Sequence, residues 1–219
     1  MNTKVYSYPF YRCLFLILIL GSLFSCTTPN SKIQINQPII AKEREKIPLR
    51  VGLYLSQEFR NFAKQTVPVG ISDHRRLIFP PIYMGESLCK GAEEIVGKAF
   101  REVVLLDTRD SGSMPKEVQV LILLEIGKIY GGIQGEAVIG HEQIVLVRIK
   151  WTIIDRNGKI VYMDTFTSES KYERKVGTGG ANFTRILEAY ALAIENNFRE
   201  AFVSITSTNW WQLIKKETD

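Results

Sequence analysis

The sequence has few of the side chains that build metal centres or disulfide frameworks. Its 219 residues include three cysteines and two histidines. Neither His74 nor His141 has a second Cys or His at the spacing of a zinc ligand pair. Basic residues exceed acidic ones only slightly, 28 against 23, and they are scattered. We therefore expect no metal, no cofactor and no nucleic-acid partner.

Motifs of nucleophilic catalysis and nucleotide binding are also missing. No Gly-x-Ser-x-Gly sequence occurs, and Cys89 lies in or beside an apolar helical stripe that favours a structural thiol. Glycine clusters at 131–135 and 177–180 lack a following Lys-Ser/Thr pair, so we interpret them as a turn and a helix entry. The sequence predicts a protein that is not an enzyme. Acid–base chemistry by a pair such as Glu93 and Glu94 is the alternative to a solvated helix surface.

One long apolar run is present, at the N-terminus, and it is short for a membrane span. Lys4 and Arg12 flank its beginning, and no acidic residue precedes Glu43. The run of about 12 residues suits the core of an export signal and falls short of the roughly 20 that cross a bilayer. We predict a cleaved signal peptide over residues 1–25, whose loss removes two cations and no anion and lowers the net charge from +5 to +3.

The signal ends in Leu23-Phe24-Ser25-Cys26. This tetrapeptide resembles the lipobox of bacterial lipoproteins, with Leu three residues before the cysteine and a small residue just before it. The resemblance implies diacylglycerol on the Cys26 thiol, cleavage before Cys26 and acylation of the new amine. Several acyl chains, such as palmitate, anchor a protein stably in a membrane. The alternative is an ordinary cleaved signal that happens to end near a cysteine.

Thr27 follows the cysteine in place of Asp. This resembles the class of lipoproteins sorted to the outer membrane, which implies a location there, facing the periplasm. Residues 26–46 would hold the lipidated N-terminus and a flexible tether, because the stretch is rich in polar residues and has no periodicity. The alternative for its isoleucines, Ile33, Ile35, Ile39 and Ile40, is an added edge strand or docking on a partner.

Residues 47–219 are expected to form one α+β domain. Alternation of apolar residues predicts strands at 47–55, 103–106, 117–130, 143–154 and 159–172, with Val118 to Ile126 lining one face of the third and Val145 to Ile153 one face of the fourth. Asp155-Arg156-Asn157-Gly158 predicts a hairpin turn between the last two, because Asn and Gly tolerate a positive φ. A helix opens at Gly85, with an apolar stripe that extends through Phe100 and Val103, and a second helix covers 182–206. One-sided strands and one-striped helices favour two layers, a mainly antiparallel sheet with both helices on one face.

The order of these elements, over residues 47–206, resembles that of small outer-membrane assembly lipoproteins such as the lipopolysaccharide-assembly lipoprotein. Those proteins also place a helix before a meander and a long helix last. In this arrangement we expect Phe198 to lie on the same core wall as Ile149 and Trp151.

Two groups of residues are candidates for binding. Arg50, Arg148 and Lys150 alternate away from the apolar faces of their strands and should share the uncovered face of the sheet. This is a solvated face or a site for an anionic partner. Trp210 and Trp211 either pack on the domain or anchor at a bilayer interface or a partner.

These features together predict a non-enzymatic cell-envelope lipoprotein. Its partners would be the membrane, through the N-terminal lipid, and a protein of an envelope complex that it serves as an accessory or assembly module. The alternative is a binding module for an anionic envelope glycan or lipid, which would use the exposed basic face of the sheet.

Overall fold

The computed structural model describes residues 32, 33, 35, 39, 45–64, 69–70, 76–77, 81–134, 142–173 and 182–218. The chain divides into two units by its internal contacts, 1–30 and 31–219, and every described residue belongs to the second unit. The expectations for the signal peptide, Cys26, the two histidines and the cluster 177–180 fall outside the described residues.

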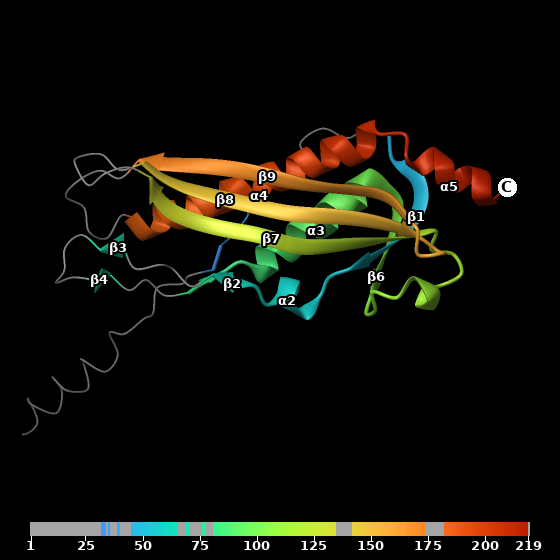
Figure 1. Ribbon diagram of the computed structural model, residues 1–219, viewed down its shortest axis with the longest axis horizontal. Coiled ribbons are helices and arrows are strands. Elements are labelled where there is room, and N and C mark those ends of the chain that lie inside the picture. Colours follow the sequence, from blue (N-terminus) through green and yellow to red (C-terminus); the bar gives the residue numbers. More distant parts are fainter. Residues whose placement is uncertain are drawn as a thin grey trace, which may run out of the picture. The chain divides into compact units, whose positions relative to one another are not determined.

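Five strands form the main sheet in the spatial order β6-β1-β7-β8-β9 (Figure 1). β1 pairs in parallel with β6 and β7, whereas β7, β8 and β9 form a long antiparallel meander. The antiparallel registers contain most of the paired residues, which confirms the expected α+β class and the mainly antiparallel sheet. The bounds are Ile47–Tyr54 for β1, Phe100–Leu106 for β6, Val120–Gln134 for β7, Glu142–Asp155 for β8 and Ile160–Glu173 for β9.

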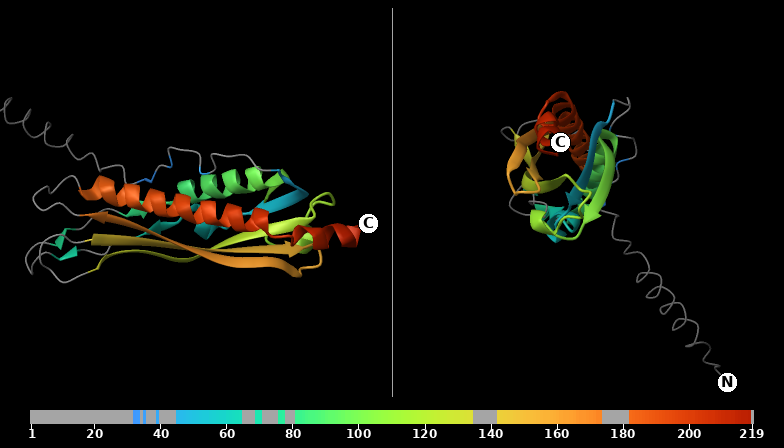
Figure 2. Two further views of the ribbon diagram at one scale, coloured as in Figure 1. Left: turned by 90° about the horizontal axis from the view of Figure 1, so that it is seen from above. Right: turned by 90° about the vertical axis from the view of Figure 1, so that its right-hand side faces the viewer.

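Two helices, α3 (Gly85–Ala99) and α4 (Asn182–Ser207), cover one face of this sheet (Figure 2). α4 lies against β8 and β9, α3 lies against β1 and β6, and the two helices also contact each other. The smaller elements are α2 (Gln57–Arg60), α5 (Trp211–Thr218), a 3-10 turn (Ser111–Ser113) and two pairs of short strands, β2 (Ala63–Lys64) with β5 (Ile82–Tyr83) and β3 (Val69–Gly70) with β4 (Arg76–Leu77).

The main core lies between the helices and the sheet, and alternate strand residues build it. The predicted face of β8 is fully buried from Val145 to Ile153. The Trp151 and Phe198 rings pack edge to face, with their centroids 5.9 Å apart. The expected position of Phe198 on this wall is therefore confirmed.

The boundary between α3 and β6 differs from the expectation. The helix ends at Ala99, and Phe100 is already extended, with φ −119° and ψ 156°. Phe100 and Val103 thus belong to β6, not to the helical stripe. The local pattern fits either element, and parallel pairing of β6 with β1 decides it.

Val118 also differs from the expectation. It precedes β7 and joins a second, smaller cluster with Leu106, Met114 and Leu121, apart from the main core. The segment 107–119, which joins β6 to β7, contributes Met114 and Val118 to this cluster. Arg156 holds it by donating from Nε to the carbonyl of Val118, at 2.8 Å, and from Nη2 to the carbonyl of Pro115.

The turn between β8 and β9 is the predicted hairpin. One carboxylate oxygen of Asp155 accepts from the backbone N–H groups of Asn157 and Lys159, both at 2.8 Å. Gly158 has a φ of +81°, which only glycine adopts without strain.

Part of the expected tether packs on the domain. Ile33 and Ile39 are 4% and 2% exposed and belong to the main core, and Ile35 packs against it. Lys32 forms a parallel bridge with Tyr83. These contacts agree better with the alternative of an added edge strand than with a free tether. Packing of the domain therefore begins before Ile47.

Candidate functional site

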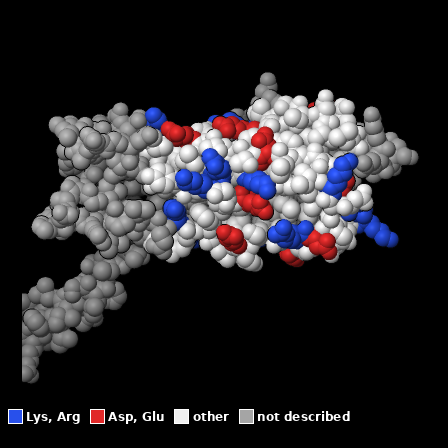
Figure 3. All heavy atoms as spheres, in the orientation of Figure 1, with Lys and Arg blue, Asp and Glu red and all other residues white. Residues whose placement is uncertain are grey.

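The face of β7, β8 and β9 that points away from the two helices is called the open face here. Figure 3 shows this face, with charged residues of both signs distributed over a mostly uncharged surface. The register places Lys128, Arg148 and Thr167 in one row across the three strands, and Glu125, Lys150 and Thr165 in the next row. Tyr130 and Met163 flank these two rows on the same face.

Arg148 and Lys150 are together on the open face, as expected for two residues of one strand. Arg148 is exposed, and its Nε donates to Oγ1 of Thr167 at 3.1 Å. Lys150 Nζ lies 3.3 Å from Oε2 of Glu125, with both side chains substantially exposed. In water such a pair contributes little to stability, so it orients the ammonium group more than it holds the fold.

Arg50 does not join them. Its neighbour Val51 lies opposite Val120, whereas Lys150 lies opposite Glu125. This offset of several residues separates Arg50 from Lys150 by about 20 Å along the strands, at 3.3 Å per residue. Arg50 also pairs with Glu102 at 3.0 Å and with Glu117 at 3.8 Å, which compensates its charge locally.

The cation that lies beside Arg148 is Lys128, which the sequence alternation did not identify. β7 has a bulge between Ile126 and Lys128, at Gly127, and the extra residue reverses which positions face the core. Ile126 and Ile129 both pack inward as a result, and Lys128 is exposed on the open face. Gly127 itself could have indicated the bulge from the sequence, because a glycine inside a strand pattern often marks one.

Gly127 also provides room for Arg148. A Cβ atom at position 127 would lie 3.3 Å from both Cγ and Cδ of Arg148. A larger residue at position 127 would therefore crowd the aliphatic part of the Arg148 side chain.

Gly131 has a different role from the turn that we expected. It lies within β7, where a Cβ atom would come within 2.2 Å of the Tyr190 hydroxyl oxygen. Burial raises the pKa of Tyr190 to about 12, so this hydroxyl is neutral. The glycine permits close helix–sheet packing.

Large apolar side chains accompany the charges of the open face. Tyr130 is 45% exposed and Met163 is 57% exposed, and Ile160 is exposed near the hairpin turn. Lys128 Nζ lies 5.5 Å from the centroid of the Tyr130 ring, within the range of a cation–π contact. The open face thus combines aromatic, thioether and cationic groups.

A crevice of about 340 Å³ adjoins this face, between α2 and β7. Its lining includes Tyr54, Phe59, Arg109 and Glu125. The volume is at the lower end of those found for small-molecule sites, and the crevice is continuous with the open face through Glu125.

Trp210 packs on the domain. It is 7% exposed, its Nε1 donates to the carbonyl of Ile205 at 3.2 Å, and its ring lies 6.1 Å from those of Phe100 and Tyr162. Trp211 is partly buried against the same core. The interface role is thus unavailable to Trp210 without local unfolding.

Cys89 is partly buried on α3, and burial raises the pKa of its thiol, which disfavours the nucleophilic thiolate. Glu94 pairs with Lys98 one turn along the same helix, at 3.1 Å. Across the part of the chain that the structure describes, no group of three or more His, Cys, Asp or Glu side chains could hold a metal ion.

None of the described helices combines the length and the apolar character that crossing a membrane requires.

No family model matches the chain, and no curated protein matches it. Among solved structures it is similar to a minor lipoprotein from Acinetobacter baumannii, with 11% identity over 74% of this chain and 94% of that one, at a TM-score of 0.44. It is also similar to lipoprotein GNA1162 from Neisseria meningitidis, with 9% identity over 68% of this chain and 95% of that one, at a TM-score of 0.32. Likenesses this distant assign no family and no function.

Proposed function

We propose that this protein is a non-enzymatic lipoprotein of the bacterial cell envelope that serves an envelope complex as an accessory or assembly module. Acyl chains on Cys26 anchor it in the outer membrane, facing the periplasm, and the open face of the sheet binds a protein component of that complex. The lipobox-like tetrapeptide ending at Cys26 supports the anchor, and the composition of the open face supports the binding role.

The observation that carries the binding role is the apolar content of the open face. A sheet face that meets only water needs no large apolar side chains, yet Tyr130, next to Lys128, and Met163, next to Thr165, are about half exposed. Tyr, Met and Arg are enriched in protein–protein interfaces, whereas Lys is depleted there. The face is therefore suited to a protein surface that covers Tyr130 and Met163 and leaves the lysine at the rim.

The anchor is tested by replacing Cys26→Ser and determining the N-terminal mass of the membrane-bound protein. We expect acyl mass on residue 26 of the wild type, and an uncleaved, unacylated precursor for the variant. Cys13→Ser is the matched control, because Cys13 leaves with the signal peptide. A wild-type protein that is cleaved but carries an unmodified Cys26 would contradict the anchor.

The binding face is tested with a photo-crosslinking residue at Thr165, in the centre of the open face, and at Glu200, on the exposed side of α4. We expect a discrete adduct with one envelope protein from position 165 and not from position 200. In the Thr165 background, Arg148→Glu with Met163→Asp should remove the adduct while the far-UV spectrum stays unchanged. Identical adducts from both positions would exclude the open face as the binding surface.

A second candidate function is favoured by one observation: Lys128 and Arg148 lie side by side, and neither has an ion-pair partner among the described residues. Two such cations could hold an anionic envelope glycan or lipid, with Lys150 at their side. Arg50 has no part in this site, for the reasons of position and pairing given above.

Salt distinguishes the two candidates. Binding to an anionic glycan or lipid through exposed cations should weaken steeply as the Debye length falls below about 8–10 Å. Binding to a protein through Tyr130 and Met163 should depend far less on salt. Vesicles with and without anionic phosphatidylglycerol, and purified lipopolysaccharide, are the probes, and Lys128→Ala with Arg148→Ala is the variant that should abolish anion binding.

A further inference from the structure

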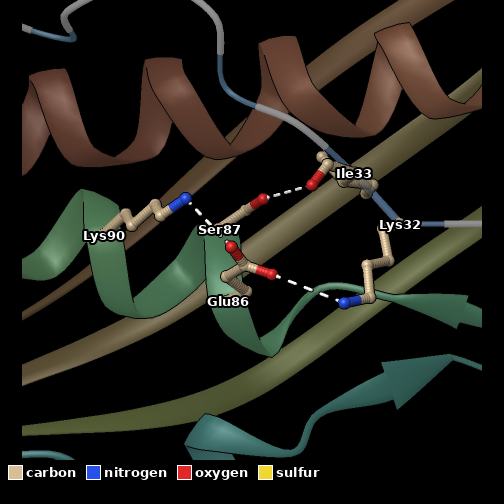
Figure 4. A network of polar contacts seen from close by, with 5 residues as sticks. All are labelled: Lys32, Ile33, Glu86, Ser87 and Lys90. Atoms are coloured by element: carbon tan, nitrogen blue, oxygen red, sulfur yellow. Dashed lines mark hydrogen bonds and ion pairs between the residues drawn. The ribbon is translucent and has the colours of Figure 1, made fainter.

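The chain segment between Cys26 and β1 contacts the domain at several points. Before residue 40 its described residues are Lys32, Ile33, Ile35 and Ile39, and we call these four residues the N-terminal strap. Figure 4 shows the beginning of the strap beside the N-terminal turn of α3, where Glu86 lies between two lysines and Ser87 points to the carbonyl of Ile33.

Backbone contacts attach the strap to the edge of the small sheet. Ile33 N–H donates to the carbonyl of Tyr83 at 3.2 Å, and Lys32 is paired with Tyr83 in parallel. Since Tyr83 belongs to β5, which pairs with β2, the strap extends this two-stranded sheet. The hydroxyl of Ser87 donates to the carbonyl of Ile33 at 2.6 Å in a buried position, so both backbone groups of Ile33 have partners.

Apolar contacts attach the strap to the main core. Ile33 and Ile39 are almost completely buried. A Cβ atom at Gly91 of α3 would lie 2.5 Å from the Phe198 ring of α4 and 3.2 Å from Cδ1 of Ile39. The strap therefore lies where α3 and α4 meet, and Arg199 of α4 donates to the carbonyl of Ile39 at 3.4 Å.

A charge contact completes the attachment at its start. The Glu86 carboxylate lies 3.7 Å from Nζ of Lys32 and 2.9 Å from Nζ of Lys90. All three side chains are exposed, so these ion pairs add little stability. The pair of Lys32 with Glu86 does fix the point at which the strap leaves the domain.

We propose that the strap stays docked in the acylated protein and limits how far the domain can move from the membrane. The inference rests on the acylation of Cys26 proposed above. With the strap docked, residues 27–31 alone separate the lipidated residue from the domain, and the six residue steps from Cys26 to Lys32 span at most about 22 Å. A tether that ran unattached to Ile47 would span up to about 75 Å.

A short tether limits which partners the open face can meet. A domain whose point of attachment stays within about 22 Å of its lipid anchor is suited to partners that are embedded in the same membrane or lie on it. Tyr83, which is 51% exposed and paired with Lys32, is an accessible position of the domain close to the start of the strap. We therefore expect the partner of the open face to be a membrane-embedded or membrane-attached protein.

Two insertions of the same flexible sequence test the strap. A Gly/Ser segment of about 20 residues is placed between Asn30 and Ser31, before the strap, or between Ala41 and Lys42, after it. The full acylated protein is reconstituted in phosphatidylethanolamine vesicles with acceptor-labelled headgroups. A donor fluorophore is attached at Tyr83→Cys in a Cys89→Ala background, and energy transfer to the headgroups is measured.

The insertion before the strap should lower the energy transfer, because the mean end-to-end distance of the spacer grows about twofold, from about 13 to about 28 Å. The insertion after the strap should leave the transfer at its uninserted value, because Tyr83 stays beside the docked strap. An equal loss of energy transfer from both insertions, or no loss from either, would overturn the docking of the strap. The proposed function would be unaffected by that result. If the uninserted protein does not associate with the vesicles, acylation is refuted, and the proposed role of the strap is refuted with it.

Discussion

The two faces of the five-stranded sheet are made by alternate residues of the same strands, yet they are held in different ways. On the covered face of β8, Trp151 and its neighbours are fully buried, and α4 packs against them. On the open face, Arg148 and Lys150 each make one polar contact with an adjacent strand and otherwise meet solvent. The comparison shows that the covered face holds the main core, so the exposed residues around Arg148 can be changed for binding at little cost in stability.

The largest expected effect concerns the covered face. Phe198→Ala removes a fully buried ring that packs edge to face on Trp151, and it should lower the free energy of unfolding by about 3–5 kcal/mol. Met163→Ala, on the open face, should change it by less than about 0.5 kcal/mol. Urea denaturation of both variants measures the difference, and similar losses would contradict the contrast between the faces.

A polar contact on the covered face should have the next largest effect. The buried Asn197 amide donates from Nδ2 to the carbonyl of Val147 at 3.1 Å and to that of Phe166 at 2.8 Å, which ties α4 to β8 and β9. Asn197→Ala should cost about 2 kcal/mol, because two buried hydrogen bonds are lost. The neighbouring Asn196, whose Oδ1 accepts from Arg199 near the surface, is the control. Asn196→Ala should leave the urea midpoint nearly unchanged.

A substitution at the Gly127 bulge tests how far the open face depends on the position of Arg148. Gly127→Val should displace the Arg148 side chain, since a Cβ atom would lie 3.3 Å from two of its carbons, and should cost about 1 kcal/mol through crowding. The crosslink from position 165 should weaken more than this small loss of stability explains. Gly97→Ala, at an α3 position with no atom close to the added Cβ, should raise stability by about 0.5–1 kcal/mol. An unchanged crosslink in the Gly127 variant would show that the position of Arg148 does not matter.

The smallest expected effect is the pH dependence of the ion pair at the strap. The hydrogen bond and charge of Lys90, followed by the charge of Lys32, lower the pKa of Glu86 from its ordinary value of 4.5. A lowered pKa in the folded state means that the stabilising contribution is present above the unfolded pKa and is lost as the pH falls through the folded pKa. The wild type should therefore be slightly more stable to urea than Glu86→Gln at neutral pH, and this difference in stability should disappear below pH 4.5. Urea midpoints of both proteins at neutral and acidic pH measure it; an advantage that grows on acidification would contradict the sign.

Local patterns predicted several elements well, because their causes are local. The alternation in β8 placed Val145 to Ile153 on the covered face, and the apolar stripe of α4 placed Phe198 there. The Asp155 carboxylate and the positive φ of Gly158 explain the hairpin that the residues of the turn predicted.

The candidate site was predicted less completely, because strand register is a tertiary property. Arg148 and Lys150 were identified, but Lys128 was missed, since the bulge at Gly127 reverses the alternation that a sequence pattern assumes. Arg50 was grouped with them on the correct face, and only the pairing of β1 with β7 shows how far along the sheet it lies.

The sequence by itself determined the period of each strand and helix, the hairpin turn and the apolar face of each element, because these depend on residues close together in the chain. Tertiary structure decided the parallel pairing of β1, the end of α3 at Ala99, the burial of Trp210 and the docking of Ile33 and Ile39. Each of these depends on a partner many residues away. Its free energy comes from burying apolar surface and pairing backbone groups between distant segments, and a pattern read along one segment does not contain that information.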